Sequence, residues 1–278
     1  MLAAARAGAG DFDGAIEAYE RGIVLAHAEG NLIGAYGCTY GQAMYMLIQG
    51  RLTEAEKFCR LTINRAIREG HGNIPAAGWL HIVMARINLE RGRLDEAGAY
   101  LKDGLRIARP GGFSEAERSG RYLSAHLAAI RGDLDAATDI FQNIERIVNA
   151  MDEPYLTGEL NWQWAALCLK VGDLIAAREK LHILEEKIAA TQHANLRLWQ
   201  RWLLPRLLSA EERYEEALTE LDKSIRRARA VNSNGELIRL LALQAVTLDA
   251  LEDRVPAQVA LHEALALGEP EGYIWLWL

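Results

Sequence analysis

The six residues Gly172-Asp173-Leu174-Ile175-Ala176-Ala177 carry the pattern that decides the fold, because that pattern recurs along the whole chain. A glycine opens it, a hydrophobic residue stands third and an alanine closes it. Five clear copies begin at Gly10, Gly50, Gly92, Gly132 and Gly172, and two weaker copies begin at Glu212 and Glu252. The closing alanines, spaced 40, 42, 40, 40, 40 and 40 residues apart, are Ala15, Ala55, Ala97, Ala137, Ala177, Ala217 and Ala257. So regular a period indicates stacked supersecondary units and excludes a two-domain globule.

Each unit is predicted to contain two helices, called A and B here. Apolar residues recur at steps of three and four around each copy, as in the series Ala177, Leu181, Leu184 and Ile188, and no strand-like alternation is present. The glycine ends helix A, and helix B follows it. We therefore expect an all-α fold, a right-handed superhelical solenoid of about seven 40-residue helix-turn-helix repeats.

Small residues recur in a second column, twelve positions before each closing alanine. The residues in this column are Ala3, Ala43, Ala85, Ala125, Ala165, Pro205 and Ala245. Two helices approach closely only where both carry small side chains, so these two columns mark the crossing of helix A and helix B. Pro205 lies inside a helix A, which we expect it to kink or shorten.

The paired small columns around a glycine turn resemble the tetratricopeptide repeat (TPR). This chain departs from that pattern in its longer period and in lacking the usual aromatic residue early in helix A. We expect residues 1–278 to form a single TPR-like domain, with incomplete helices at residues 1–8 and 269–278. Solenoids need polar capping repeats, so we expect the chain to be part of a longer protein or to have its ends covered by a partner.

Composition and charge restrict the environment of the chain and its partners. The formal net charge is −7, which opposes binding to nucleic acid or to an anionic membrane. Cys38, Cys59 and Cys168 lie far apart without a C-x-x-C pair, which favours a reducing compartment. No apolar run approaches the roughly 20 residues that cross a bilayer. We therefore expect a cytoplasmic protein without nucleic acid or membrane binding of its own.

No motif for catalysis or metal binding is present in the sequence. The chain lacks a Gly-Lys phosphate-binding loop, a G-x-S-x-G elbow and an H-E-x-x-H motif. No two of the seven histidines stand three or four residues apart, as helical zinc ligands would. We expect neither an enzyme, nor a metal site, nor a cofactor bound by this chain.

The candidate binding residues are aromatic and charged side chains at fixed positions of helix A. Four of six residues that stand fifteen positions before a closing alanine are aromatic, and Trp, Arg and His residues lie one turn away. In a TPR fold helix A lines the concave groove, so these residues would form one stripe. The stripe comprises Tyr40, Trp79, Arg86, Tyr122, His126, Trp162, Trp199, Trp202 and Arg206.

Flat rings flanked by hydrogen-bonding groups suit a sugar or a peptide. The alternative is that the rings only fill space between neighbouring helices, and the sequence leaves both interpretations open. We expect the Trp162 and Trp202 rings to lie about 20 Å apart, two helix spacings, so that only an extended ligand would bridge them.

Residues 264–274, Ala-Leu-Ala-Leu-Gly-Glu-Pro-Glu-Gly-Tyr-Ile, closely resemble the end of the repeat region in LuxR-type, ATP-dependent regulators of the MalT kind. Trp275 and Trp277 replace residues that are more often Arg and Phe there. In that family the repeats follow an ATP-binding module and precede a helix-turn-helix, and neither module is present in these residues. The family's ATP would therefore bind in the missing N-terminal module.

The resemblance implies a sensor domain for signal transduction. In such a domain a small-molecule inducer or a partner protein contacts the repeats, and binding is coupled to self-association and to activation of transcription. The inducer differs among relatives, and an oligosaccharide is one candidate. The competing interpretation is a free-standing TPR scaffold that binds a peptide or a partner protein.

Overall fold

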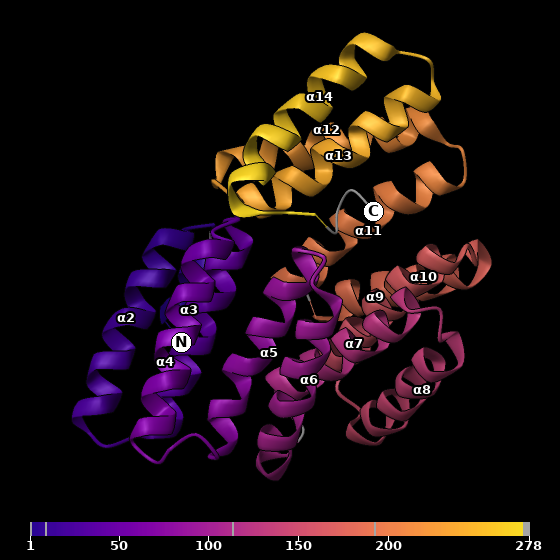
Figure 1. The fold of residues 1–278 in the computed structure, drawn as a ribbon. Coiled ribbons are helices and arrows are strands. Elements are labelled where there is room, and N and C mark those ends of the chain that lie inside the picture. The colour runs from indigo at the N-terminus through magenta and orange to yellow at the C-terminus, as the bar shows by residue number, and fades with distance from the viewer. Residues whose placement is uncertain (1, 9, 113, 192, 275–278) are drawn as a thin grey trace. The chain divides into compact units, whose positions relative to one another are not determined.

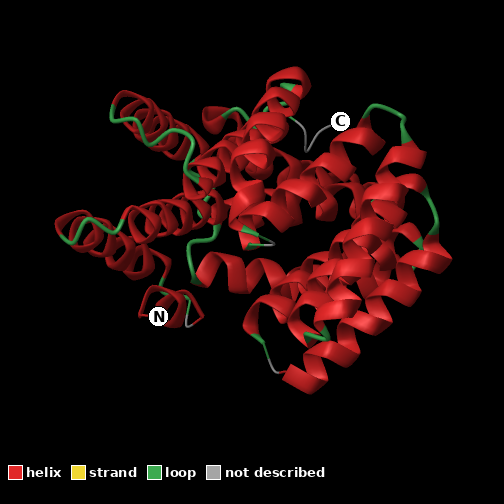
Figure 2. Ribbon diagram, turned by 90° about the horizontal axis from the view of Figure 1, so that it is seen from below, coloured by secondary structure: helices red, strands yellow, loops and turns green. Residues whose placement is uncertain are grey.

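The computed structural model describes residues 2–8, 10–112, 114–191 and 193–274. Within those ranges the chain is helical and contains no strand (Figure 2), which confirms the expected all-α class. The α-helices and two short 3-10 helices (η) are α1 (Leu2–Gly8), α2 (Phe12–Ala28), α3 (Leu32–Ile48), α4 (Leu52–Arg68), α5 (Pro75–Glu90), α6 (Leu94–Ala108), η1 (Arg109–Gly111), α7 (Glu115–Ile130), α8 (Leu134–Met151), α9 (Pro154–Val171), α10 (Leu174–Thr191), α11 (Ala194–Ala210), α12 (Tyr214–Ala230), α13 (Asn234–Ala250), α14 (Arg254–Gly268) and η2 (Glu269–Glu271).

The repeat signature lies at the turn between two helices, as the sequence predicts. Both columns of small residues are buried at the helix crossings: Ala137 and Ala177 have no exposed surface, and neither do Ala125 and Ala165. Side chains this small let the two backbones of a pair approach closely. The observed helix pairs therefore confirm the register read from the alanine columns.

The turn positions adopt the left-handed backbone conformation, which explains the recurring glycine. Gly132 and Gly172 have φ of 84° and 80°, and glycine accepts such angles without a Cβ clash. In the two weaker copies Glu212 and Glu252 occupy the same conformation, with φ of 62° and 61°. A side chain at this angle is strained, so these two turns are less favourable than the glycine turns.

We expect Glu212→Gly to raise the free energy of unfolding by about 0.5–1 kcal/mol, because it removes left-handed strain at the turn. Glu215→Gly, in the first turn of α12, is the matched control and should lower stability by a similar amount. Chemical denaturation of the two variants gives the comparison. A loss of stability in Glu212→Gly would contradict the strain argument.

The structure differs from two expectations about irregular positions. Pro205 does not shorten its helix: α11 continues past it to Ala210, and the buried ring occupies the small-residue column. A kink at Pro205 stays a prediction. Residues 269–274 do not begin another helix: a 3-10 turn ends at Glu271 and Gly272 is left-handed, with φ of 77°. The expected helix also included residues 275–278, which lie outside the described residues. Residues 2–8 are helical as expected.

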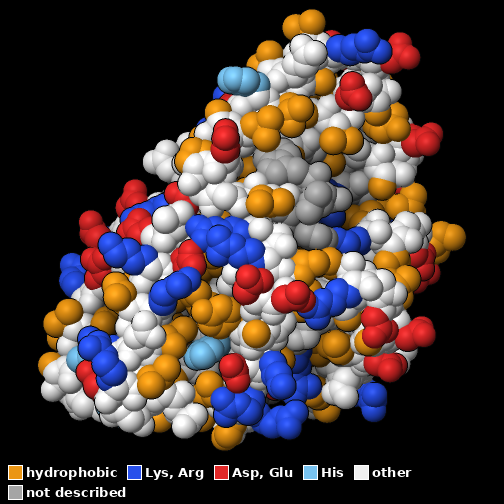
Figure 3. Space-filling view, viewed as in Figure 1, with side chains coloured by type: hydrophobic (Ala, Val, Ile, Leu, Met, Phe, Trp, Pro, Cys, Tyr) orange, Lys and Arg blue, Asp and Glu red, His pale blue; other side chains and the backbone are white. Residues whose placement is uncertain are grey.

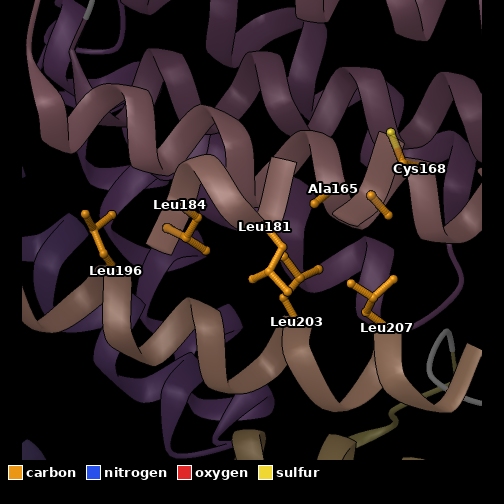
Figure 4. Close-up of a cluster of buried hydrophobic side chains, with 8 residues drawn as sticks. Ala165, Cys168, Leu181, Leu184, Leu196, Leu203 and Leu207 are labelled. Atoms are coloured by element: carbon orange, nitrogen blue, oxygen red, sulfur yellow. The ribbon is translucent and has the colours of Figure 1, made fainter. Parts of the chain in front are cut away.

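The chain packs as two compact units that are discontinuous in sequence. Unit 1 comprises residues 1–127, 230–236 and 266–278, and unit 2 comprises residues 128–229 and 237–265. Both units consist of helix pairs of the same kind. The interpretation of the chain as one repeat domain stays a prediction. Figure 4 shows the core of unit 2, where Leu181 and Leu184 of α10 face Leu196, Leu203 and Leu207 of α11.

Candidate ligand-binding site

The predicted stripe is divided between the two units. Tyr40, Trp79, Arg86, Tyr122 and His126 belong to unit 1, on α3, α5 and α7. The remaining members belong to unit 2, on α9 and α11: Trp162, Trp199, Trp202 and Arg206.

The three predicted tryptophans of unit 2 form one contiguous cluster. The rings of Trp162 and Trp199 are stacked, with centroids 4.7 Å apart and an interplanar angle of 7°. Trp202 is also adjacent, with its centroid 6.0 Å from that of Trp162. The expected separation of about 20 Å between Trp162 and Trp202 is thus wrong. That expectation counted two helix spacings. In the structure α9 and α11 are direct neighbours, and the indoles of Trp162 and Trp202 meet where the two helices contact each other.

The cluster continues to two residues that the sequence analysis did not select. Tyr155 packs against Trp199 at 5.8 Å between ring centroids and against His193 at 4.4 Å. Burial lowers the pKa of His193, which favours its neutral imidazole. Neither residue stands in a column of the repeat, so the periodic pattern gave no signal for them. We call Tyr155, Trp162, His193, Trp199 and Trp202 the aromatic cluster.

The aromatic cluster lies at the margin of the hydrophobic core of unit 2. Trp162 and Trp199 pack against the buried residues shown in Figure 4, yet both keep partial exposure to solvent. The Nε1 of Trp202 is buried and has no hydrogen-bond partner among the described residues. An unpaired buried donor of this kind costs roughly 1–3 kcal/mol.

A group of cations stands on α9, α11 and α13 of unit 2. Arg206 follows Trp202 by one turn on α11, and its residue surface is exposed. Enough protein nevertheless surrounds the guanidinium that burial lowers its pKa. The charge of Arg239 on α13 lowers that pKa further. Burial lowers the pKa of Lys170, at the end of α9, to about 8, and the charge of Arg206 adds to the shift. Positive charge accumulated beside aromatic rings favours ligands with electronegative groups.

The predicted residues of unit 1 are more enclosed. Tyr122 is 1% exposed and Tyr40 is 8% exposed, so neither ring offers an open face. Trp79 meets the edge of Tyr40 at 6.2 Å between centroids, and Arg86 donates a hydrogen bond to Ser119 Oγ at 3.1 Å. Trp79, Arg86 and His126 keep partial exposure. A ligand-binding role for this group stays a prediction.

The cysteines are free thiols, and their surroundings disfavour the reactive thiolate. Burial raises the pKa of Cys59 to about 12 and also raises the pKa of Cys38 and of Cys168. A thiol with a raised pKa is a poor nucleophile. These residues therefore serve as small packing groups.

The described residues contain no cluster of His, Cys, Asp and Glu suited to a metal ion. Within the same ranges, no helix combines the length and apolar character needed to span a bilayer. On the face seen in Figure 3, Lys and Arg side chains are interspersed with Asp and Glu.

A family model described as the MalT-like TPR region matches residues 1–278. The chain belongs to this family. It is also 27% identical over 219 residues to the HTH-type transcriptional regulator MalT of Serratia proteamaculans (strain 568). The match covers 75% of this chain and 23% of that regulator, so the MalT-like region spans about a quarter of the curated relative.

For this MalT-like TPR region, the resemblance read from residues 264–274 is confirmed at the level of the family. The periodic columns located Trp162, Trp199, Trp202 and Arg206, which the structure gathers on two neighbouring helices. The same columns missed Tyr155, His193 and Lys170. Arg239 stands in the column of Trp199 but was not selected as a site residue. Tyr155 and His193 join the rings through packing between helices, which a repeat register does not encode.

Proposed function

We propose that this MalT-like TPR region is the signal-sensing domain of a transcriptional regulator and that it binds an inducer at the aromatic cluster. The observation that carries the proposal is the partly exposed, stacked Trp162–Trp199 pair, with Trp202 beside it and Arg206 one turn beyond Trp202 on α11. Indole faces supply apolar contact area, while the exposed Arg206 supplies donors that orient hydroxyl or carboxylate groups.

A compact ligand suffices at this site, because the centroids of Trp199 and Trp202 both lie within 6.0 Å of that of Trp162. An oligosaccharide stacked on the exposed face of the tryptophan pair fits this chemistry, and the cations favour a ligand with anionic or hydroxyl-rich edges. Binding would order α9 and α11 as one body, since the cluster joins the two helices. In a longer regulator this ordering would be coupled to self-association and to transcription.

We propose that this region has no catalytic activity, since TPR repeats typically act by recognition. Because a transcriptional regulator acts where the DNA is, we propose a cytoplasmic location.

The free-standing scaffold remains the second interpretation. It would place a peptide or a partner protein on the same cluster.

Titration of tryptophan fluorescence tests the proposal on the full chain. Maltooligosaccharides, sugar phosphates and short peptides, both acidic and neutral, are added separately. We expect one class to give a saturable change in emission and to raise the midpoint of thermal unfolding, because a ligand that binds only the folded state stabilises it. A saturable response to peptides alone would favour the scaffold, and no response to any class would count against a ligand site here.

A further inference from the structure

The segment that follows α14 lies against helices far earlier in the chain, within unit 1 (Figure 1). The backbone N–H of Thr53, in the first turn of α4, donates a hydrogen bond to Glu271 Oε2 at 2.7 Å across 218 residues of sequence. The backbone N–H of Ile274 donates to the carbonyl oxygen of Glu90, at the end of α5, at 2.9 Å. Residues 269–274 thus touch the starting turn of α4 and the last turn of α5.

Arg91 connects both sides of this contact. Its Nε donates to the carbonyl oxygen of Glu271 at 3.2 Å, and its Nη2 donates to Thr53 Oγ1 at 3.0 Å. Its Nη1 pairs with Glu56 of α4, and the side chain of Arg91 is only 9% exposed. Burial acts to raise the pKa of Glu56, but hydrogen bonds and charge from Arg91 and Arg60 outweigh it and hold that pKa below its usual range. The buried guanidinium therefore keeps an ionised partner.

The backbone of the segment is shaped to fit this position. Gly272 adopts a φ of 77°, and a Cβ added there would lie 3.4 Å from Arg91 Nε. A Cβ added at Gly92 would lie 3.3 Å from Ile274 Cγ2. Tyr273 is 3% exposed, whereas Ile274 remains 49% exposed. The segment is anchored by one buried ring and a small number of polar contacts.

Glu271 accepts a hydrogen bond from the first turn of α4, a role that the N-cap aspartate plays in three other repeats. The side chains of Asp11, Asp133 and Asp173 cap their helices B by accepting a backbone N–H of the first turn. At α4 the corresponding residue is Arg51, which makes no such bond. A carboxylate at a helix N-terminus satisfies an orphan donor and offsets the helix dipole. Glu271 supplies this carboxylate to α4 from the other end of the chain.

We propose that residues 269–274 form a latch. Glu271 caps α4 from the distant end of the same chain, and the segment docks and releases as one unit. Apart from the Tyr273 ring, the contacts named above are hydrogen bonds, and those of Thr53 with Glu271 and Arg91 are exposed to solvent. Exposed hydrogen bonds of this kind are typical of elements that open locally. When the latch opens, the starting turn of α4, the turn after α5 and the end of α14 change state together. The latch is independent of the ligand site proposed above, because it involves none of the aromatic cluster.

Hydrogen exchange on the full chain tests the latch, with Glu271→Ala as the variant and Glu269→Ala as the matched control. Glu269 lies in the same 3-10 turn and is exposed. We expect Glu271→Ala to accelerate exchange of the Thr53 and Ile274 amides together, by about fivefold, as loss of a typical N-cap would. Glu269→Ala should leave both rates unchanged. Unchanged exchange at Thr53 in Glu271→Ala would overturn the latch, and acceleration at Thr53 alone would overturn its release as one unit.

A second substitution separates capping from docking. Arg51→Asp gives α4 an internal aspartate cap like those of α2, α8 and α10. Added to Glu271→Ala, it should restore slow exchange in the first turn of α4 while Ile274 continues to exchange fast. Failure to restore protection in α4 would show that Glu271 is not its cap.

Discussion

Ala177→Leu should lower the free energy of unfolding by about 1–3 kcal/mol, because it forces three extra carbons into a closed helix crossing. Ala177 has no exposed surface and packs in the core of unit 2, which also contains Ala165, Leu181 and Leu203. Neither α9 nor α10 can move apart without opening the contacts of Leu181 and Leu184 seen in Figure 4. The loss is measured by urea denaturation monitored by circular dichroism.

Ala190→Leu is the matched control for this variant. Ala190 lies on the same helix, α10, but is exposed to solvent. The added side chain then meets water, and surface substitutions of this kind change stability by no more than about 0.5 kcal/mol. Equal losses in the two variants would contradict the assignment of Ala177 to the helix crossing.

Trp162→Ala should weaken binding of the ligand identified by the fluorescence titration by about tenfold or more, as loss of a central aromatic contact does. The substitution removes one face of the stacked pair with Trp199 and the neighbour of Trp202. Binding is measured by isothermal titration calorimetry, and stability is measured on the same preparation. If Trp162 belongs mainly to the ligand site, the free energy of unfolding changes little.

Trp164→Ala provides the contrast on the same helix. Its ring stacks on Phe141 with centroids 5.4 Å apart, and Lys180 Nζ lies 3.9 Å from its centroid. We expect this variant to lose stability and to keep its affinity for the ligand. If Trp162→Ala instead lowers stability by about 3–5 kcal/mol with affinity retained, its ring is a packing element and the alternative left open by the sequence is correct.

The sequence located much of the candidate site but not its geometry. Trp162, Trp199, Trp202 and Arg206 were selected because equivalent positions of a repeat face the same way on helix A. The distance between Trp162 and Trp202 was not accessible to that argument, since a register fixes which face a residue occupies and not how far its side chain reaches. Direct contact of α9 with α11 reduces an expected 20 Å to 6.0 Å.

By itself the sequence determined the helix pairs, their turns and their crossings. These features depend on local chemistry, namely glycine at a left-handed turn and alanine where two backbones meet, and the period repeats that chemistry at each unit. Tertiary structure alone decided that α11 passes through Pro205 and that Tyr155 and His193 join the tryptophans. It also decided that Glu271 caps α4, because residues 218 positions apart meet only after the intervening helices have packed.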